Sequence, residues 1–387
     1  MSVYLDHAAT TPILPEALAA LTRALATVGN PSSVHSAGQH AKMLLEDGRV
    51  AVARSLDAEP VEVVFTSGGT ESINLAVKGL FWARQRDRAR PRIVVPAGEH
   101  HATVDTVEWL ERHEGAVVDV VPLDAQGRVD LAELEARLAD ASDVALVTFL
   151  WANNEVGTIQ PVERIVALAH AAGVPVHSDA VAAYGQVPVS FAASGLDALS
   201  VSAHKIGGPV GIGALVLGRR TTVEPLLHGG GQQRQVRSGT QDAPAAAAFG
   251  VAASAGLHDR SALRDRLVAG VAGVVPSAVL MGDPVDRLPG NAHFTFPGCE
   301  GDSLLFLLDA AGVAVSTGSA CQAGVPEVSH VLLAMGLSEE DARGALRITL
   351  GHTSTAADVD AFVAALPDAV ARAGAAGMAS RAPLLGR

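Results

Sequence analysis

One lysine of this chain stands where an apolar run ends and a glycine turn begins. The segment 197–209 has the sequence DALSVSAHKIGGP, so Lys205 follows a strand-like stretch and precedes a Gly-Gly-Pro turn. A lysine fixed at the end of regular structure can serve as a reactive amine. Ser202 and His204 lie beside it and are suitable donors to a phosphate. A solvated surface lysine is the alternative if the motif stands alone.

Two other segments supply what such an amine needs in order to hold a phosphorylated aldehyde cofactor. The pattern predicts a strand over residues 61–66, a Ser-Gly-Gly-Thr-Glu turn over residues 67–71 and a helix over residues 72–85. The glycine turn and the start of that helix can bind an anion. Asp179 ends another predicted strand, where a carboxylate can pair with a protonated pyridine nitrogen or simply cap a helix. Together with Lys205, these features predict a site for pyridoxal phosphate.

A cysteine and an arginine complete the set of candidates. Cys321 lies among small residues and glycines in the segment 313–324, which favours an accessible thiol. The other cysteine, Cys299, is interpreted as buried and inert. Arg347 is the single charge in the apolar run 345–350, where it can form a salt bridge or a bidentate clamp on a carboxylate.

The elements that must position these residues alternate between strands and helices from residue 61 to residue 217. This alternation predicts an α/β fold whose mostly parallel sheet binds ligands at its strand ends. After an alanine-rich helix the composition changes, and a βαβ-like pattern predicts a second, smaller α/β domain. We therefore expect a large cofactor-binding domain over residues 14–257, and a small domain formed by residues 1–13 and 258–387 that carries the cysteine loop.

Composition excludes several classes of function. The chain has 387 residues, of which 49% are hydrophobic and 18% charged, as expected for a globular protein of about two domains. A formal net charge of −13 disfavours direct binding to nucleic acid or anionic membranes. No apolar run is long enough to span a bilayer and the N-terminus lacks a signal-peptide pattern, so we expect a cytoplasmic protein. Two cysteines predict neither a disulfide framework nor a metal site.

Six motifs in this order resemble the cysteine desulfurases of the NifS/IscS type, which are fold-type I pyridoxal-phosphate enzymes related to the class V aminotransferases. The resemblance covers nearly the whole chain and rests on YLDHAATTP (4–12), GGTES (68–72), NNEVG (153–157), SAHK (202–205), RSGT (237–240) and GSAC (318–321). It implies a large domain with a seven-stranded type of sheet. It also implies a homodimer with shared active sites, L-cysteine as substrate and a protein that accepts sulfur.

The resemblance implies a role for each candidate. Lys205 would bond the cofactor, Asp179 would pair with its pyridine nitrogen and His100 would stack on its ring. Cys321 would take the substrate sulfur as a persulfide, so the implied catalytic residues are Cys321, Lys205 and His100. The implied cofactor-binding residues are Gly69, Thr70, His100, Asn154, Asp179, Ser202, Ala203, His204, Lys205 and Thr240, the last from the neighbouring subunit. Asn154 and Arg347 would hold the substrate carboxylate.

The sequence departs from the family pattern at a few positions. Ala182 stands where members usually carry glutamine, Ala203 where they carry glycine, and Gln322 where serine or threonine often follows the cysteine. We also expect no long C-terminal extension for docking an iron–sulfur scaffold. The alternatives to a desulfurase are a related lyase of the selenocysteine lyase kind, an aminotransferase, or a non-catalytic cofactor-binding platform. The sulfur could pass to iron–sulfur cluster assembly, tRNA thiolation or another pathway.

Overall fold

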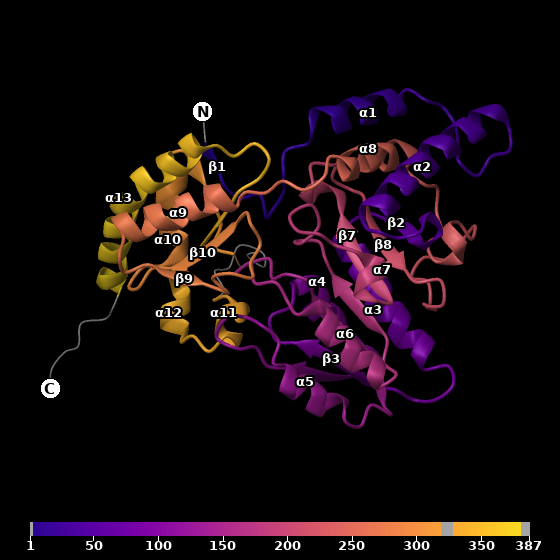
Figure 1. Cartoon of the computed structure of the whole chain (residues 1–387), viewed down its shortest axis with the longest axis horizontal. Helices are drawn as coiled ribbons and strands as arrows, with labels where there is room; N and C mark the ends of the chain where they lie inside the picture. The colour runs from indigo at the N-terminus through magenta and orange to yellow at the C-terminus, as the bar shows by residue number, and fades with distance from the viewer. Residues whose placement is uncertain (1–2, 319–327, 381–387) are drawn as a thin grey trace.

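The structure is a computed structural model that describes residues 3–318 and 328–380, with side chains described up to residue 375. In the described part of the chain, two bodies lie side by side (Figure 1). The larger contains the long mixed sheet and the first eight helices. The smaller contains two short sheets and the last five helices, and the chain starts there before it crosses to the larger body.

The larger body is built on a seven-stranded sheet with the order β2-β8-β7-β6-β5-β3-β4. The five strands from β7 to β4 run parallel, whereas β8 is antiparallel to both β7 and β2. This confirms the predicted fold class. The strands are β2 (Val63–Thr66), β3 (Arg92–Pro96), β4 (Val117–Val121), β5 (Val144–Leu150), β6 (Val176–Asp179), β7 (Ala198–Ser202) and β8 (Gly213–Leu217).

Helices cover both faces of this sheet, and therefore its central strands β5, β6 and β7 are buried along their whole length. All seven residues of β5 are buried. One face packs on α2, α5, α6 and α8, and the other on α3 and α4. The helices of this body are α1 (Pro15–Leu25), α2 (Ser36–Ser55), α3 (Gly69–Arg84), α4 (His101–Glu114), α5 (Leu131–Leu138), α6 (Val162–Ala171), α7 (Phe191–Ser194) and α8 (Ala243–Ser254).

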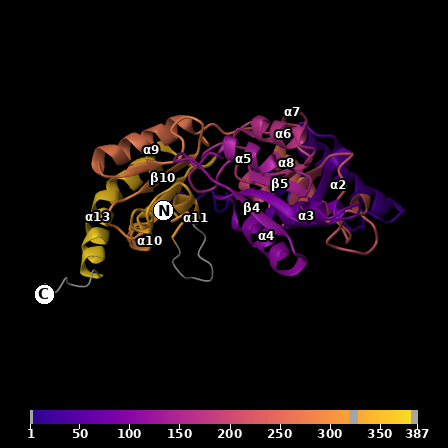
Figure 2. The same cartoon turned by 90° about the horizontal axis from the view of Figure 1, so that it is seen from below.

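The smaller body contains a three-stranded antiparallel sheet with the order β12-β10-β9 and a parallel pair formed by β1 and β11. Its helices pack against these sheets (Figure 2). The strands are β1 (Val3–Tyr4), β9 (Val279–Met281), β10 (Asn291–Thr295), β11 (Val313–Ala314) and β12 (Ala345–Thr349). The helices are α9 (Ser261–Val274), α10 (Gly301–Ala310), α11 (His330–Ala334), α12 (Glu339–Arg343) and α13 (Ala356–Ser380).

The βαβ-like interpretation of this second region was wrong in one respect. β9 and β10 are antiparallel neighbours. The connection over residues 282–290 is too short for the helical crossover that parallel neighbours need. The domain boundaries themselves stay a prediction.

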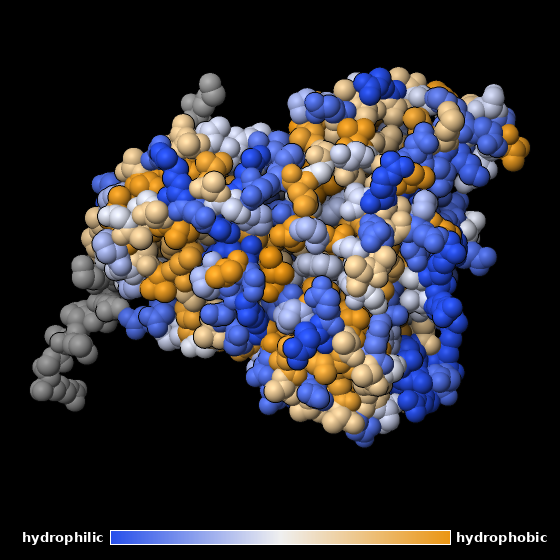
Figure 3. Space-filling view, viewed as in Figure 1, coloured by the Kyte–Doolittle hydropathy of each residue, from blue (hydrophilic) through white to orange (hydrophobic). Residues whose placement is uncertain are grey.

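Hydrophilic and hydrophobic residues are interspersed over the face of both bodies that Figure 3 shows. Among the described residues, no helix combines the length and the apolar character needed to cross a membrane. Within the residues that the structure describes, three short 3₁₀ turns complete the fold, and one of them carries Lys205. They are η1 (Pro60–Glu62), η2 (Ala203–Lys205) and η3 (Gln233–Gln235).

Candidate active site

A cavity of about 480 Å³ opens where β5, β6 and β7 end and where the N-terminal segment and the small antiparallel sheet face them. This is the edge at which parallel sheets usually bind ligands. Most of the residues predicted from the sequence line it, together with several that were not predicted. The predicted residues in the lining are Gly69, Thr70, His100, Asn154, Asp179, Ser202, His204, Lys205 and Arg347.

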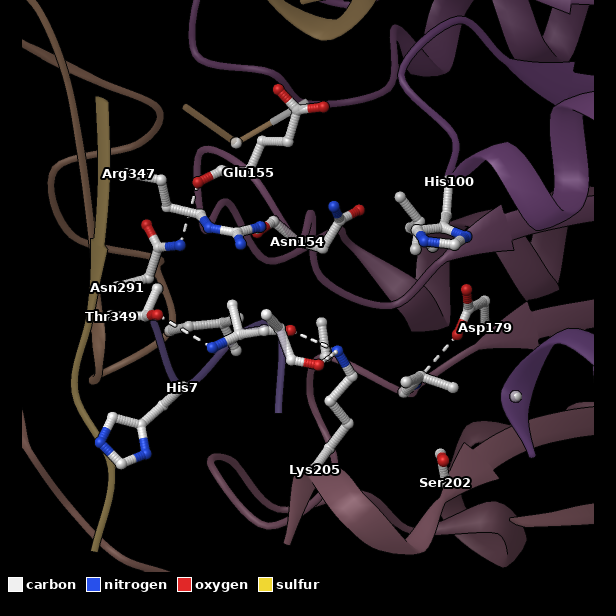
Figure 4. A pocket seen from close by; sticks show the side chains of 18 of the residues that line it. His7, His100, Asn154, Glu155, Asp179, Ser202, Lys205, Asn291, Arg347 and Thr349 are labelled. Atoms are coloured by element: carbon white, nitrogen blue, oxygen red, sulfur yellow. Dashed lines mark hydrogen bonds between the residues drawn. The ribbon is translucent and has the colours of Figure 1, made fainter. Parts of the chain in front are cut away.

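Lys205 is the last residue of η2, directly after β7, and its side chain extends into the cavity (Figure 4). Its Nζ donates hydrogen bonds to the carbonyl oxygens of Ala8 and Ala9, the latter at 3.0 Å. Burial lowers the pKa of Lys205 to about 8, and the positive charge of Arg347 adds to that effect. Roughly a tenth of this amine is therefore neutral at pH 7, far more than for an ordinary lysine, and the neutral form is the nucleophile.

Asp179 ends β6 and is 3% exposed. Its Oδ1 accepts a hydrogen bond of 2.9 Å from the backbone N–H of Val181. Burial raises the pKa of Asp179 to about 6, because a carboxylate away from water is costly unless a positive partner compensates it. The side chain is thus suited to a cationic ring nitrogen.

The hydroxyl of Ser202 is buried and makes no hydrogen bond to any of the residues that the structure describes. The residue is 1% exposed and lines the cavity. Buried hydroxyls nearly always have a partner, so this one fits a missing acceptor. Figure 4 shows it on the same side of the site as Asp179.

The start of α3 faces the cavity beside Ser202. The helix begins at Gly69, three residues before the predicted start, which places Gly69 and Thr70 in its first turn. A Cβ on Gly69 would lie 2.8 Å from a methyl group of Val181, so glycine permits the close approach. Unpaired N–H groups at a helix start favour an anion such as phosphate.

Two neutral histidine rings border the cavity. His100 caps the N-terminus of α4, and its Nδ1 accepts a 3.0 Å hydrogen bond from the backbone of Ala102. Burial, with the charge of Lys205 second, lowers the pKa of His100 to about 4. Burial also lowers the pKa of His204 to about 4, and its Nδ1 lies 3.2 Å from Thr10 Oγ1. Both rings are therefore uncharged at neutral pH.

Arg347 lies opposite, on β12 of the smaller body. Its Nη1 donates to the backbone oxygen of Asn154 at 2.9 Å, and its Nη2 donates to Asp6 Oδ1 at 2.9 Å. Its Nε is buried and has no partner within the described residues. The guanidinium is thus oriented by two groups and still has a free donor, which fits recognition of a carboxylate.

Some predicted residues are not brought together here. Thr240 is exposed and Ala203 is fully buried, and neither lines the cavity as the described residues form it. Cys321, like Gln322, lies outside the described residues. Cys299 is 5% exposed, with its Sγ 3.7 Å from the carbonyl oxygen of Val370, and burial followed by the nearby Glu300 raises its pKa.

Sequence reasoning missed several groups at the cavity. Asp6, which orients Arg347, and Glu155, which accepts a hydrogen bond from Ser329, both occur in motifs that the sequence analysis singled out. His330 lines the cavity as well and donates through Nε2 to the backbone oxygen of Glu99 at 2.8 Å. The acidic residues were visible within the motifs, but no pattern near His330 indicated its place.

Comparison with known proteins places the chain in a family. Residues 3–362 match the sequence pattern described as Aminotransferase class-V. The chain belongs to the aminotransferase class-V family. A relative from Mycobacterium tuberculosis, named IscS-like cysteine desulfurase, is 54% identical over 97% of this chain and 98% of its own length.

Solved structures agree with this assignment. A NifS-like protein superposes with a TM-score of 0.88 at 34% identity and covers 96% of this chain and 100% of its own. A structure described as SspA in complex with cysteine gives a TM-score of 0.81 at 32% identity, over 90% of this chain and 99% of its own. The resemblance to NifS/IscS-type proteins is thereby confirmed.

Proposed function

We propose that this class-V protein is a pyridoxal-phosphate-dependent L-cysteine desulfurase. The observation that carries the proposal is the combination of Lys205, Asp179 and Ser202 in one cavity. The cavity holds a buried amine with a lowered pKa, a buried carboxylate with a raised pKa, and a buried hydroxyl that has no hydrogen-bond partner among the described residues. The named desulfurase relative and the cysteine-bound structural neighbour support cysteine as the substrate.

The residues present fit pyridoxal phosphate. Lys205 would bond its aldehyde carbon, Asp179 would keep its ring nitrogen protonated, and the neutral ring of His100 would lie against its ring. Its phosphate would be held by Gly69 and Thr70 at the start of α3 and by Ser202 and His204 around the end of β7, whereas Ala203, whose N–H donates to the carbonyl oxygen of Ile212, lies outside the cavity. When bound, the cofactor supplies an electron sink that stabilises negative charge on the substrate.

The substrate carboxylate would be held by Arg347 and Asn154. The Nε of Arg347, which has no partner in the described part of the chain, and its two oriented amino groups provide donors that match a carboxylate. The side-chain amide of Asn154 would donate as well. With the substrate fixed in this way, the Lys205 amine would accept the proton from the substrate α-carbon and return a proton to the product.

The Cys321 thiolate would attack the sulfur of bound cysteine. The sulfur–carbon bond of the substrate breaks, a sulfur–sulfur bond forms on Cys321, and the carbon skeleton gains a proton and leaves as L-alanine. One thiol and one cysteine thus give one persulfide and one alanine, without an external oxidant or reductant. The persulfide would then pass to a thiol of an acceptor protein.

We also propose a homodimer in the cytoplasm. Large apolar side chains are exposed on α1 and α2, with Leu18, Leu25 and Met43 being 49%, 67% and 54% exposed. A second copy of the chain could cover these side chains. Thr240, which does not line the cavity of its own subunit, would then reach the phosphate of the neighbouring subunit.

The lyase, aminotransferase and platform alternatives are not favoured by the relatives' names.

The experiment measures L-alanine formed from L-cysteine by the cofactor-loaded protein. The proposal predicts stoichiometric or catalytic alanine that disappears in Lys205→Ala. Pyruvate and free ammonia, or transfer of the amino group to a keto acid, in place of alanine would reject the desulfurase assignment in favour of a lyase or an aminotransferase.

A further inference from the structure

The loop over residues 228–241 has an unfavourable backbone conformation that other contacts must stabilise. Three consecutive residues without glycine's freedom, Gln233, Arg234 and Gln235, have positive φ angles of 48°, 61° and 64°. This left-handed conformation is unfavourable for residues with side chains and persists only where the surroundings enforce it. Thr240 lies at the exposed end of the same loop. The contacts that enforce the conformation therefore also position Thr240.

One contact joins the loop to strand β2. The side-chain amide of Gln233 pairs with the backbone of Phe65, accepting from its N–H at 2.8 Å and donating to its carbonyl oxygen at 2.6 Å. The buried guanidinium of Arg49 donates to the carbonyl of Val63, to Gln233 and to Gln241. These bonds fix the loop to the strand that leads into the Ser67–Glu71 turn.

A second contact reaches that turn itself. Arg237 donates to Glu71 through Nε at 2.8 Å and Nη2 at 3.3 Å, and the two side chains are only 22% and 16% exposed. Glu71 Oε2 also accepts the backbone N–H of Ser67 at 2.7 Å. Burial alone would raise the pKa of Glu71, but the hydrogen bonds from Arg237 and Ser67 outweigh burial and lower it. Glu71 is thus a charged group shared between the turn and the loop.

We propose that Glu71 and Arg237 are a positioning pair that joins two phosphate-binding segments into one unit. One segment is the start of α3 in the same subunit, which carries Gly69 and Thr70. The other is the loop that presents Thr240 to the neighbouring subunit. Through this pair, the geometry of the phosphate-binding turn in one subunit controls how tightly the neighbouring subunit retains its cofactor. The inference rests on the cofactor and the dimer of the proposed function, not on the desulfurase reaction.

The first experiment measures the rate of cofactor release from the holoenzyme, followed by the absorbance of the lysine-bound cofactor in the presence of a trap. Glu71→Gln keeps an acceptor for Ser67 but removes a negative charge, whereas Arg237→Gln removes a positive charge. If these residues acted only through their electric fields on a phosphate, the two variants would change release in opposite directions. The positioning pair predicts that both accelerate release, by about tenfold.

The double variant and a remote control sharpen this test. Because the pair acts as a unit, Glu71→Gln combined with Arg237→Gln should release cofactor no faster than the more severe single variant. Arg266→Gln, which breaks the exposed ion pair with Asp360 on the smaller body, should leave release unchanged. Opposite effects of the two single variants, or multiplying effects in the double variant, would overturn the proposal.

The second experiment tests the direction of coupling in a tagged heterodimer. One subunit carries Lys205→Ala with Arg237→Gln, and its partner is unmutated, so the absorbance reports the unmutated subunit's cofactor. Release should be about tenfold faster than in a heterodimer whose mutated subunit carries Lys205→Ala alone. Equal rates, or a protein that is monomeric in solution, would overturn the inference. If cofactor release is faster as predicted but the unmutated holoenzyme forms no alanine from L-cysteine, the desulfurase function is rejected and the coupling between subunits is not.

Discussion

Arg347 and Asp6 form an ion pair with a 2.9 Å contact between Nη2 and Oδ1, although they are 341 positions apart in the chain. The pair joins β12 to the N-terminal segment that also supplies the carbonyl partners of Lys205. The side chain of Arg347 is 6% exposed, so its orientation is fixed before substrate binds. The proposed clamp on the substrate carboxylate is therefore preorganised.

Arg347→Lys should raise KM for L-cysteine by about 10- to 100-fold, since it removes the planar fork and at least one charge-assisted hydrogen bond of about 1.5–3 kcal/mol. Asp6→Asn retains an acceptor for Nη2 and should have a smaller effect on KM. Steady-state alanine production measures both. An unchanged KM in Arg347→Lys would contradict the clamp.

Lys205 should be the lysine that bonds the cofactor, and the two other lysines of the chain, Lys42 and Lys78, should not bond it. Borohydride reduction of the holoenzyme followed by peptide mapping should place the cofactor on Lys205 alone. Lys205→Ala should lose the absorbance of the lysine-bound cofactor. A reduced adduct on Lys42 or Lys78 in the unmutated protein would exclude the assignment.

The pH dependence of Lys205 follows from its pKa of about 8, which burial lowers from 10.5. Only the neutral amine is nucleophilic, so its acylation in the cofactor-free protein should rise with pH and level off above a midpoint near 8. An ordinary lysine rises through about 10.4. Mass spectrometry of the Lys205 peptide after timed labelling gives the curve. A midpoint above 10 would show that burial does not tune this amine.

Ala182→Gln tests the departure from the family pattern. Ala182 lines the cavity, and the nearby Gln186 amide is engaged with the carbonyl oxygen of Ala182 at 3.2 Å. An added amide donor to the phenolic oxygen of the cofactor would favour its anionic form. The bound cofactor's absorbance should then titrate about one pH unit lower. Coinciding titration curves would indicate that Gln186 or another donor already serves this oxygen.

The sequence could predict the residues that lie at the ends of strands. Asp179 and Lys205 each follow an apolar run and precede a turn, and parallel strands of one sheet bring such positions to a common edge. The start of α3 was predicted too late because glycine is a poor helix former, yet Gly69 is needed where the helix approaches Val181.

Other features depend on pairings that no local pattern contains. The antiparallel order β12-β10-β9 was not predicted, because alternation along a short strand does not specify its neighbours. The contact between Asp6 and Arg347 is of the same kind, since it requires the two ends of the chain to meet. Thr240 was predicted from the resemblance alone, and its exposed position is informative only once the cavity is seen.

Cys321→Ser should bind the cofactor normally but form no persulfide and no alanine beyond background, because a hydroxyl is a poor nucleophile towards sulfur. The matched control is Cys299→Ser, whose buried thiol has a raised pKa. Cys299→Ser should retain activity within about twofold, because Cys299 does not line the cavity and the substitution changes its packing only modestly. Full turnover by Cys321→Ser would favour a lyase.

The most direct test of the desulfurase account is the mass of the Cys321 peptide after the holoenzyme meets L-cysteine. In a single turnover without an acceptor thiol, the peptide should gain the mass of one sulfur atom, and one alanine should appear for each sulfur gained. Adding a reductant should release the sulfur as sulfide and restore the original mass. Alanine without a sulfur adduct on Cys321, or an adduct on Cys299 in its place, would contradict the account.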